Sequence, residues 1–259
     1  LKKNNYSVLY TTAPNLSDKA QRNIVEWVRD GGTLVMMPGA CAADEYNEIS
    51  VILTKMTGAK QVSVERAPQL RQDEIIRAKQ TTIRIKDERF GIGEIQTKFQ
   101  TVSLFPTTGK TIAVFEDGSS AIVEAGYNKG RIFSYGFWPG ITYNLSPDRS
   151  DYKKLPYGWL KEARQMVVSP AKIANASKFV EISEELVEGC FLESDKGIAV
   201  TLLNWSGEPK KEITVVVNGA ENITKIESIE KGSLKWEKTG NSVQIKLPLN
   251  TVDVLMLYK

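Results

Sequence analysis

The hydrophobic positions of this 259-residue chain follow two patterns, and the first predicts strands alternating with helices. Residues 6–11 and 33–37 are short β-branched or apolar runs of the kind that form buried strands. Between them, Ser17 is a good N-cap, apolar residues recur on one helical face, and Gly31-Gly32 ends the helix. The apolar residues of that face are Ala20, Ile24, Trp27 and Val28. This alternation predicts parallel strands joined by right-handed crossovers.

The same pattern continues to about residue 65. Asp44 is placed to cap a second helix, which Gly58 closes, and residues 61–65 predict a third strand. The apolar face of this second helix is Ile49, Ile52, Leu53 and Met56. Residues 71–79 then predict a short helix and residues 81–86 a strand. The G-x-G of residues 90–93 has no third glycine, so it predicts a turn and not a phosphate loop.

Antiparallel pairing is predicted from residue 111 onward. Residues 111–115 and 121–124 flank the turn signal Asp117-Gly118, which is typical of a hairpin. A second turn at Asn128-Lys129-Gly130 leads into residues 131–137. We expect these strands to form an antiparallel edge on the same α/β sheet.

The second pattern begins after Lys178, where short strands follow one another between turns. The predicted strands are 179–182, 189–193, 198–203, 213–217, 223–229, 234–237, 243–247 and 252–257. Strands at this spacing are typical of an antiparallel β-sandwich. Before them, residues 157–168 have helical spacing, which Ser169-Pro170 is expected to end. The predicted organisation is an α/β domain over 1–145, a linker and helix over 146–170, and an all-β sandwich over 171–259.

Composition removes several classes of function. Lysine and arginine (34) barely exceed aspartate and glutamate (31), and the charges are interspersed, so we expect no nucleic-acid partner. The apolar runs are far too short to cross a membrane, so we expect no membrane partner. Histidine, the commonest general base and metal ligand, is absent. Cys41 and Cys190 match no zinc spacing, and we expect free thiols, no metal and no cofactor.

Two stretches resemble a known family. The run from Leu16-Ser17 through Gly31-Gly32-Thr33-Leu34-Val35 to Asp44-Glu45-Tyr46-Asn47 is similar to the middle of the trimerisation domain of family 42 β-galactosidases. Residues 117–124, 129–132 and 135–137 resemble the last hairpin of that domain. The resemblance implies a flavodoxin-like, class I glutamine-amidotransferase-like domain with a partly parallel sheet and helices. It also implies a small C-terminal β-sandwich, which residues 198–205 and 251–257 fit.

Two features of that family have no counterpart in this sequence. Family members carry a catalytic TIM barrel before this region, and the barrel supplies the acid and the nucleophile. Their trimerisation domain also begins with a β-α unit before the strand that matches residues 6–11. We therefore expect a fragment of a longer, multimodular protein, with any export signal upstream of Leu1.

Cys41 is the candidate nucleophile of the chain. Amidotransferases place such a cysteine in G-x-C-x-G on a strand-to-helix turn, where the helix N-terminus lowers the thiol pKa and a histidine takes the proton. Here the sequence Gly39-Ala40-Cys41-Ala42-Ala43 keeps the first glycine and lacks the second, and no histidine exists. We interpret Cys41 as a small or vestigial residue, with a cysteine-dependent amidohydrolase as the alternative.

Three polar residues and a group of aromatic residues are the candidate binding residues. Asp44 and Glu45 suit either a helix cap or an acid/base pair, and Glu45 or Asn47 can reach across a subunit or domain boundary. Aromatic residues near the linker either stack on sugar rings or pack the two domains together. They are Trp138, Tyr143, Tyr152, Tyr157 and Trp159. Trp205 and Trp236 offer the same choice in the sandwich, between core packing and a carbohydrate-binding face.

The sequence therefore predicts a non-catalytic accessory or assembly region of a glycoside hydrolase-like protein. The first domain would associate with its own copies or with a catalytic barrel domain, and the second would brace it. A carbohydrate-binding module and an amidohydrolase using Cys41 remain as alternatives. An autonomous glycosidase needs two carboxylates across a cleft, and the sequence nominates no such pair.

Overall fold

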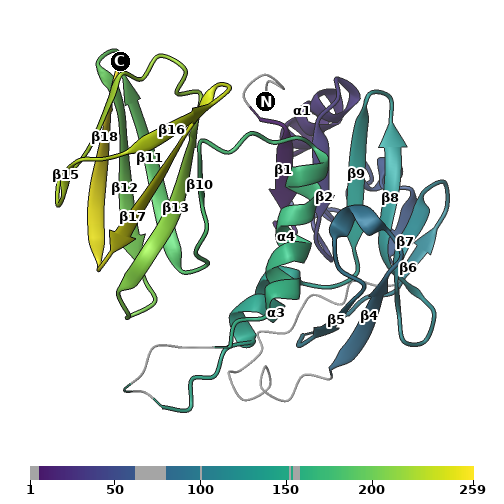
Figure 1. Ribbon diagram of the computed structural model, residues 1–259. Helices are drawn as coiled ribbons and strands as arrows, with labels where there is room; N and C mark the ends of the chain where they lie inside the picture. Colours follow the sequence, from purple (N-terminus) through teal and green to yellow (C-terminus); the bar gives the residue numbers. More distant parts are fainter. Residues whose placement is uncertain (1–5, 62–79, 100, 152, 154–157) are drawn as a thin grey trace. The chain divides into compact units, whose positions relative to one another are not determined.

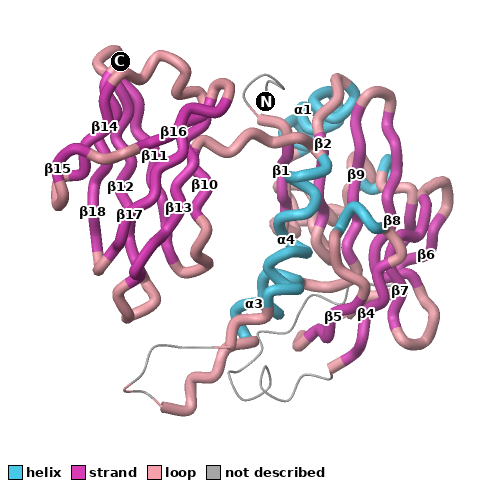
Figure 2. The backbone as a smooth tube through the Cα atoms, in the orientation of Figure 1, coloured by secondary structure: helices cyan, strands magenta, loops and turns pink. Residues whose placement is uncertain are grey.

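The computed structural model describes residues 6–61, 80–99, 101–151, 153 and 158–259. The chain divides into two compact units, Leu1–Ala176 and Ser177–Lys259, each with its own hydrophobic core (Figures 1 and 2). The helix that was expected between the two domains therefore belongs to the first unit. Among the described residues, every helix lacks the length and apolar character needed to cross a bilayer.

A mixed sheet forms the centre of the first unit. Its strands are β1 Val8–Thr11, β2 Thr33–Met36, β3 Ala59–Gln61, β4 Thr81–Ile85, β5 Glu94–Thr97, β6 Leu104–Pro106, β7 Lys110–Phe115, β8 Ser120–Tyr127 and β9 Gly130–Tyr135. They lie in the order β1-β2-β9-β8-β7-β4-β5, with β6 paired to β8 and to β3. β1, β2 and β9 are parallel, and β9, β8, β7, β4 and β5 are successively antiparallel.

The pairing confirms one part of the sequence prediction and corrects another. The two turns expected at Asp117-Gly118 and at residues 128–130 join antiparallel neighbours, β7 to β8 and β8 to β9. The parallel alternation, however, stops after β2, because β3 pairs antiparallel with β6. Residues 62–65 of the expected third strand and the expected helix over 71–79 lie outside the described residues.

Helices cover both faces of this sheet (Figure 2). α1, Asp18–Arg29, begins where Ser17 Oγ accepts the N–H of Ala20, and its apolar face packs with Leu34 and Met36 of β2. α4, Lys161–Ile173, and the short 3-10 helix η2, Glu88–Phe90, share the other core cluster with Val35. Successive strand residues point to opposite faces, so β2 is buried on both sides. A third helix, α3 Pro139–Leu145, precedes α4.

α4 continues through Pro170, although the sequence predicted that Ser169-Pro170 would end it. Proline has no N–H to give to the carbonyl of residue 166, and Tyr135 Oη of β9 donates to that carbonyl at 3.0 Å instead. Tyr10 Oη of β1 donates to the next carbonyl, that of Val167, at 2.6 Å. Burial raises the pKa of Tyr10 to about 12, so its hydroxyl keeps the donated proton at neutral pH. Tyr135 thus supplies the hydrogen bond that Pro170 cannot make, and Tyr10 adds a second bond from the sheet to the same helix.

The second unit is formed by antiparallel strands in two sheets. The strands are β10 Val180–Ile182, β11 Val187–Ser194, β12 Gly197–Asn204, β13 Lys210–Asn218, β14 Lys225–Ser228, β15 Gly232–Ser233, β16 Trp236–Thr239, β17 Ser242–Leu249 and β18 Val252–Tyr258. One sheet has the order β10-β13-β17-β16, and the other β11-β12-β18-β14-β15. Alternate residues of both sheets form one core, with Val200, Val215, Ile245 and Leu255 among its fully buried members.

Candidate functional site

The turn that follows β2 holds Cys41 in a fully buried position. Gly39 and Cys41 have positive φ angles, 76° and 56°, and the second is a conformation that non-glycine residues seldom adopt. Cys41 N donates to Ala13 O at 2.7 Å, and Cys41 Sγ lies 3.5 Å from Thr11 Oγ1. Burial raises the pKa of the Cys41 thiol by more than the hydrogen bond with Thr11 lowers it. The thiol is therefore protonated and shielded from solvent, whereas a cysteine nucleophile acts as an accessible thiolate.

The second helix expected after Asp44 does not form, although residues 44–58 are all described. Asp44 Oδ1 accepts the N–H groups of Tyr46 and Glu48, at 2.9 and 2.8 Å, and so closes a turn in place of a helix cap. Helical structure is limited to the 3-10 turn η1, Thr54–Met56. The apolar residues predicted to share one helical face therefore lie in different environments, since Leu53 is buried and Ile49 is 88% exposed.

The other two predicted polar residues hold the same loop in place. Glu45 Oε2 accepts the backbone N–H of Asp18 at 2.9 Å, so it satisfies a free donor at the start of α1. Asn15 Nδ2 donates to Asp44 O at 3.1 Å and to Asn47 Oδ1 at 3.3 Å, and Asn47 has a φ of 67°. Carboxylate oxygens of Asp18, Asp44 and Glu45 thus lie within 4.8 Å of one another. These hydrogen bonds and the positive end of the helix dipole account for that grouping.

Residues 44–51 form a loop, named the 44–51 loop. Its apolar side chains are exposed to solvent, and hydrogen bonds hold its backbone in place. Tyr46 is 81% exposed, Ile49 88% and Val51 48%. The loop is closed at its base by a bridge between Ala43 and Ile49, and Ser50 Oγ donates to the buried Gln21 Oε1 at 3.0 Å. Sequence reasoning missed this surface because it placed Ile49 on a buried helix face. The signal that could have revealed it is Asp44, whose short side chain competes with helix formation.

The aromatic residues near the predicted linker pack against one another in the first unit. Trp138 meets Phe99 edge to face, with ring centroids 6.5 Å apart, and Tyr143 lies 4.9 Å from Trp159. Trp138 and Tyr143 also pack against the core cluster that contains α4. Arg149 covers the Trp159 ring, 5.6 Å from its centroid. These rings are partly buried against one another, and a sugar-binding role for Trp138 and Tyr143 stays a prediction. Tyr152 and Tyr157 lie outside the described residues.

The two tryptophans of the sandwich have different environments. Trp236 packs against the sandwich core. Trp205 is 60% exposed, and its indole Nε1 donates to Glu188 Oε2 at 3.0 Å. The indole is thus exposed and held in one orientation.

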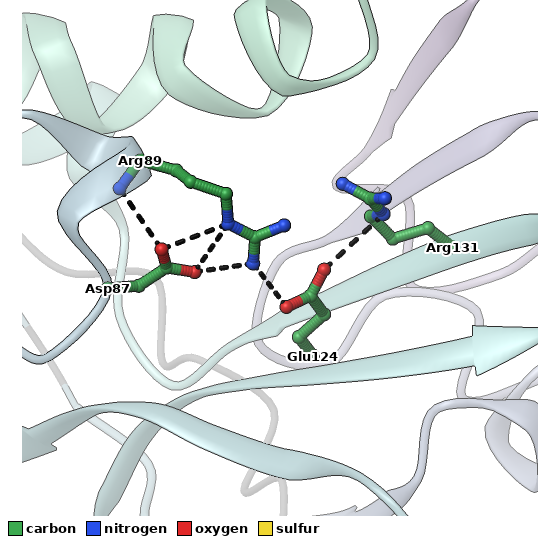
Figure 3. A network of polar contacts seen from close by, with 4 residues as sticks. All are labelled: Asp87, Arg89, Glu124 and Arg131. Carbon is green, nitrogen blue, oxygen red and sulfur yellow. Dashed lines mark hydrogen bonds and ion pairs between the residues drawn. The ribbon is translucent and has the colours of Figure 1, made fainter.

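A network of two cations and two anions, which the sequence analysis did not identify, joins η2 to the sheet (Figure 3). Arg89 Nε donates to Asp87 Oδ1 at 2.9 Å, and the same guanidinium donates to Glu124 on β8. Glu124 also pairs with Arg131 of β9, at 3.3 Å. The hydrogen bond with Arg89 holds the pKa of Asp87 below its usual value. Because the charges balance within the network, we interpret it as a clamp that seats Phe90 of η2 in the core and not as an ion-binding site.

Comparison with known proteins shows the fold at low sequence identity. No family model matches the chain, and no curated protein matches it. A catalytic mutant of a GH42 β-galactosidase from G. stearothermophilus matches 98% of this chain and 32% of its own, with 16% identity and a TM-score of 0.64. The β-galactosidase from Bacillus circulans sp. alkalophilus matches 99% and 34%, with 10% identity and a TM-score of 0.66. The α-L-fucosidase isoenzyme 2 from Paenibacillus thiaminolyticus matches 100% and 42%, with 11% identity and a TM-score of 0.68.

These structures are glycoside hydrolases, and this chain spans about a third of the length of the two β-galactosidases. Its two units in succession therefore form a fold that glycoside hydrolase chains contain as one part of a larger molecule.

Proposed function

We propose that this chain is a non-catalytic accessory and assembly region of a glycoside hydrolase-like protein. The matched structures support the relationship, because each contains this fold within a much longer chain. The burial of Cys41 and the absence of histidine argue against chemistry at the turn after β2. In this proposal the first unit is the counterpart of the flavodoxin-like, amidotransferase-like trimerisation domain that the sequence resembles, and the second unit braces it.

The main support for the assembly role is the exposed apolar side chains of the 44–51 loop. Large apolar side chains on a backbone that is already ordered bind a protein surface at low entropic cost, as interface hot spots do. Tyr46 and Ile49 have this arrangement, because the side chains of Asp44, Glu45 and Asn15 hold the loop. We assign the loop a contact with a different surface of a second copy. Such head-to-tail contacts close into rings, and the resemblance implies a ring of three.

The test is the mass of the chain by sedimentation equilibrium, for the wild type and for the double variant Tyr46→Asp/Ile49→Asp. We expect a reversible trimer whose dissociation constant rises at least tenfold in the variant, which corresponds to about 1.4 kcal/mol. Phe105→Asp is the matched control, because Phe105 is an exposed apolar residue of the same unit at 57% exposure. A trimer that the double variant leaves intact would contradict the role of the loop.

A second arm tests the absence of catalysis. The purified chain is incubated with nitrophenyl β-galactoside and nitrophenyl α-fucoside, whose parent sugars are named by the matched enzymes. We expect no release of nitrophenol above the buffer blank. Saturable turnover that Cys41→Ser or a carboxylate variant abolishes would show that the chain has a catalytic site of its own.

A further inference from the structure

The two outer faces of the sandwich differ in polarity. On the sheet β10-β13-β17-β16, the side chains that point away from the core are mostly polar or charged, as expected for an antiparallel sheet with one side in water. Glu181, Gln244 and Glu237 lie in one row across this face, with Val216 between them as an apolar exception. This outer face is therefore a mostly polar reference with which the other sheet of the same sandwich can be compared.

The outer face of the other sheet is mostly apolar, although Glu188, Thr201 and the ion pair Lys225–Glu227 also lie on it. Its residues lie in register across β11, β12 and β18, where Leu192 pairs with Ala199 and Ala199 with Met256. We name this surface the Cys190 face. It is defined by Cys190, Leu192, Ile229, Val252, Met256 and Tyr258. Leu192 is 67% exposed, Ile229 70% and Val252 47%, and Cys190 is an exposed free thiol. A hollow of about 290 Å³ lies at its Leu192 and Tyr258 corner.

The size of the Cys190 face suits a specific protein contact. β11, β12 and β18 have seven or eight residues each, and β14 lies beside them. At about 4.8 Å between strands and 3.4 Å per residue, the three long strands give roughly 14 by 27 Å, and the four residues of β14 add roughly 5 by 14 Å. With the relief of its side chains and the adjoining Trp205, the face approaches the ~600 Å² per partner at which specific interfaces begin. The largest apolar patch on a typical monomer is about 300–600 Å² and is often a functional contact.

The charged groups around the Cys190 face are compatible with its burial. Lys225 Nζ lies 2.7 Å from Glu227 Oε1 and 5.4 Å above the Tyr258 ring centroid. Lys259 Nζ lies 3.0 Å from Glu193 Oε1 at the rim. A partner that covers the face therefore leaves these four charges paired, which costs less free energy than burying them unpaired.

We infer that the Cys190 face is a contact between two copies of this chain, packed sheet against sheet across a two-fold axis. A self-complementary patch is what such an axis requires, and the apolar residues of this face can pack on the same residues of the second copy. Glu188 lies near the start of β11, and Lys196 lies in the turn after the end of β11. A two-fold axis that runs across the strands places Glu188 of one copy opposite Lys196 of the second copy. This contact goes beyond the proposed function, because it uses the second unit and is independent of the 44–51 loop. Together with the ring of three it predicts a hexamer for the wild type, so the trimer is measured in the Leu192→Glu background.

The first experiment isolates this contact in the Tyr46→Asp/Ile49→Asp background, where the loop contact is weakened. Light scattering after size exclusion is expected to show a dimer that becomes monomeric when Leu192→Glu is added, with at least a hundredfold weaker association. Val216→Glu is the matched control, because it places the same charge on the polar outer face, and it is expected to leave the dimer intact. A monomer in the loop background, or a dimer that Leu192→Glu leaves unchanged, would overturn the inference without affecting the trimer test.

The second experiment uses the thiol on the face itself. Packed sheets lie about 10 Å apart, so a bis-maleimide of similar span is expected to join Cys190 of one copy to Cys190 of the other. The covalent dimer should disappear in Cys190→Ser and in Leu192→Glu, while the buried Cys41 contributes nothing. A dimer by mass that gives no cross-link would place the interface elsewhere. A monomer whose Cys190 does not react with the maleimide at any dilution would show that the chain covers this face itself. Each of these two results would contradict the inference.

Discussion

The substitution Tyr135→Phe tests whether the sheet completes the hydrogen bonding of α4. The Tyr135 hydroxyl is fully buried and donates to Met166 O at 3.0 Å, the carbonyl that Pro170 cannot serve. Removal of the hydroxyl leaves this carbonyl without its donor in a buried site, which costs about 1–3 kcal/mol of unfolding free energy. Pro170→Ala restores a backbone N–H four residues after Met166. In that background we expect Tyr135→Phe to cost at least 1 kcal/mol less than in the wild type.

The assay is the reaction rate of Cys41 with a thiol reagent in increasing urea, in a Cys190→Ser background. Cys41 is buried in the first unit, so its exposure reports the unfolding of that unit alone. Tyr10→Phe is the control. The Tyr10 hydroxyl donates to Val167 O, and residue 171, four positions after Val167, has a backbone N–H, unlike Pro170. Its cost should be the same with and without Pro170→Ala. Equal costs of Tyr135→Phe in the two backgrounds would refute the compensation.

Three further predictions follow from the site. The hydrogen bond with Arg89 is the main cause of the lowered pKa of Asp87 in the folded chain. The contribution of Asp87 to stability is therefore complete above its unfolded pKa of about 4 and is lost as the pH falls through the lower folded pKa. Asp87→Asn should remove this part of the acid dependence of the unfolding free energy, measured by urea titrations at several pH values. At neutral pH and a dilution that keeps the chains apart, iodoacetamide should modify Cys190 and spare Cys41, as peptide mass mapping would show. Asp44→Ala should cost about 1–2 kcal/mol of local stability and speed amide exchange in residues 44–51.

Local sequence signals predicted the elements whose stability depends on nearby residues. Ser17 caps α1 as expected, and the apolar face that follows it is buried. The turn at Asp117-Gly118 joins β7 to β8 because glycine adopts the positive φ of 84° that the turn needs. The eight strands expected after Lys178 all have counterparts in the sandwich. Each of these cases needs only residues within one element or one turn.

Most of the misses depend on a partner far away in sequence, and the 44–51 loop also had a local signal in Asp44. Pro170 stays inside α4 because Tyr135 satisfies a carbonyl 31 residues away along the chain. Residues 44–51 form a loop because Asp44 bonds its own turn and Glu45 binds the start of α1, 27 residues earlier. The Arg89 network depends on Glu124, 35 residues later. No periodicity within a short window contains this information.

The central property proposed for this chain is assembly with its own copies. Sedimentation equilibrium of the wild-type chain across a wide range of concentration tests this most directly. The account predicts a reversible increase in mass with concentration, which is weakened by Tyr46→Asp/Ile49→Asp and weakened further by Leu192→Glu. A chain that keeps the mass of a monomer at every concentration, with both variants indistinguishable from the wild type, would contradict it.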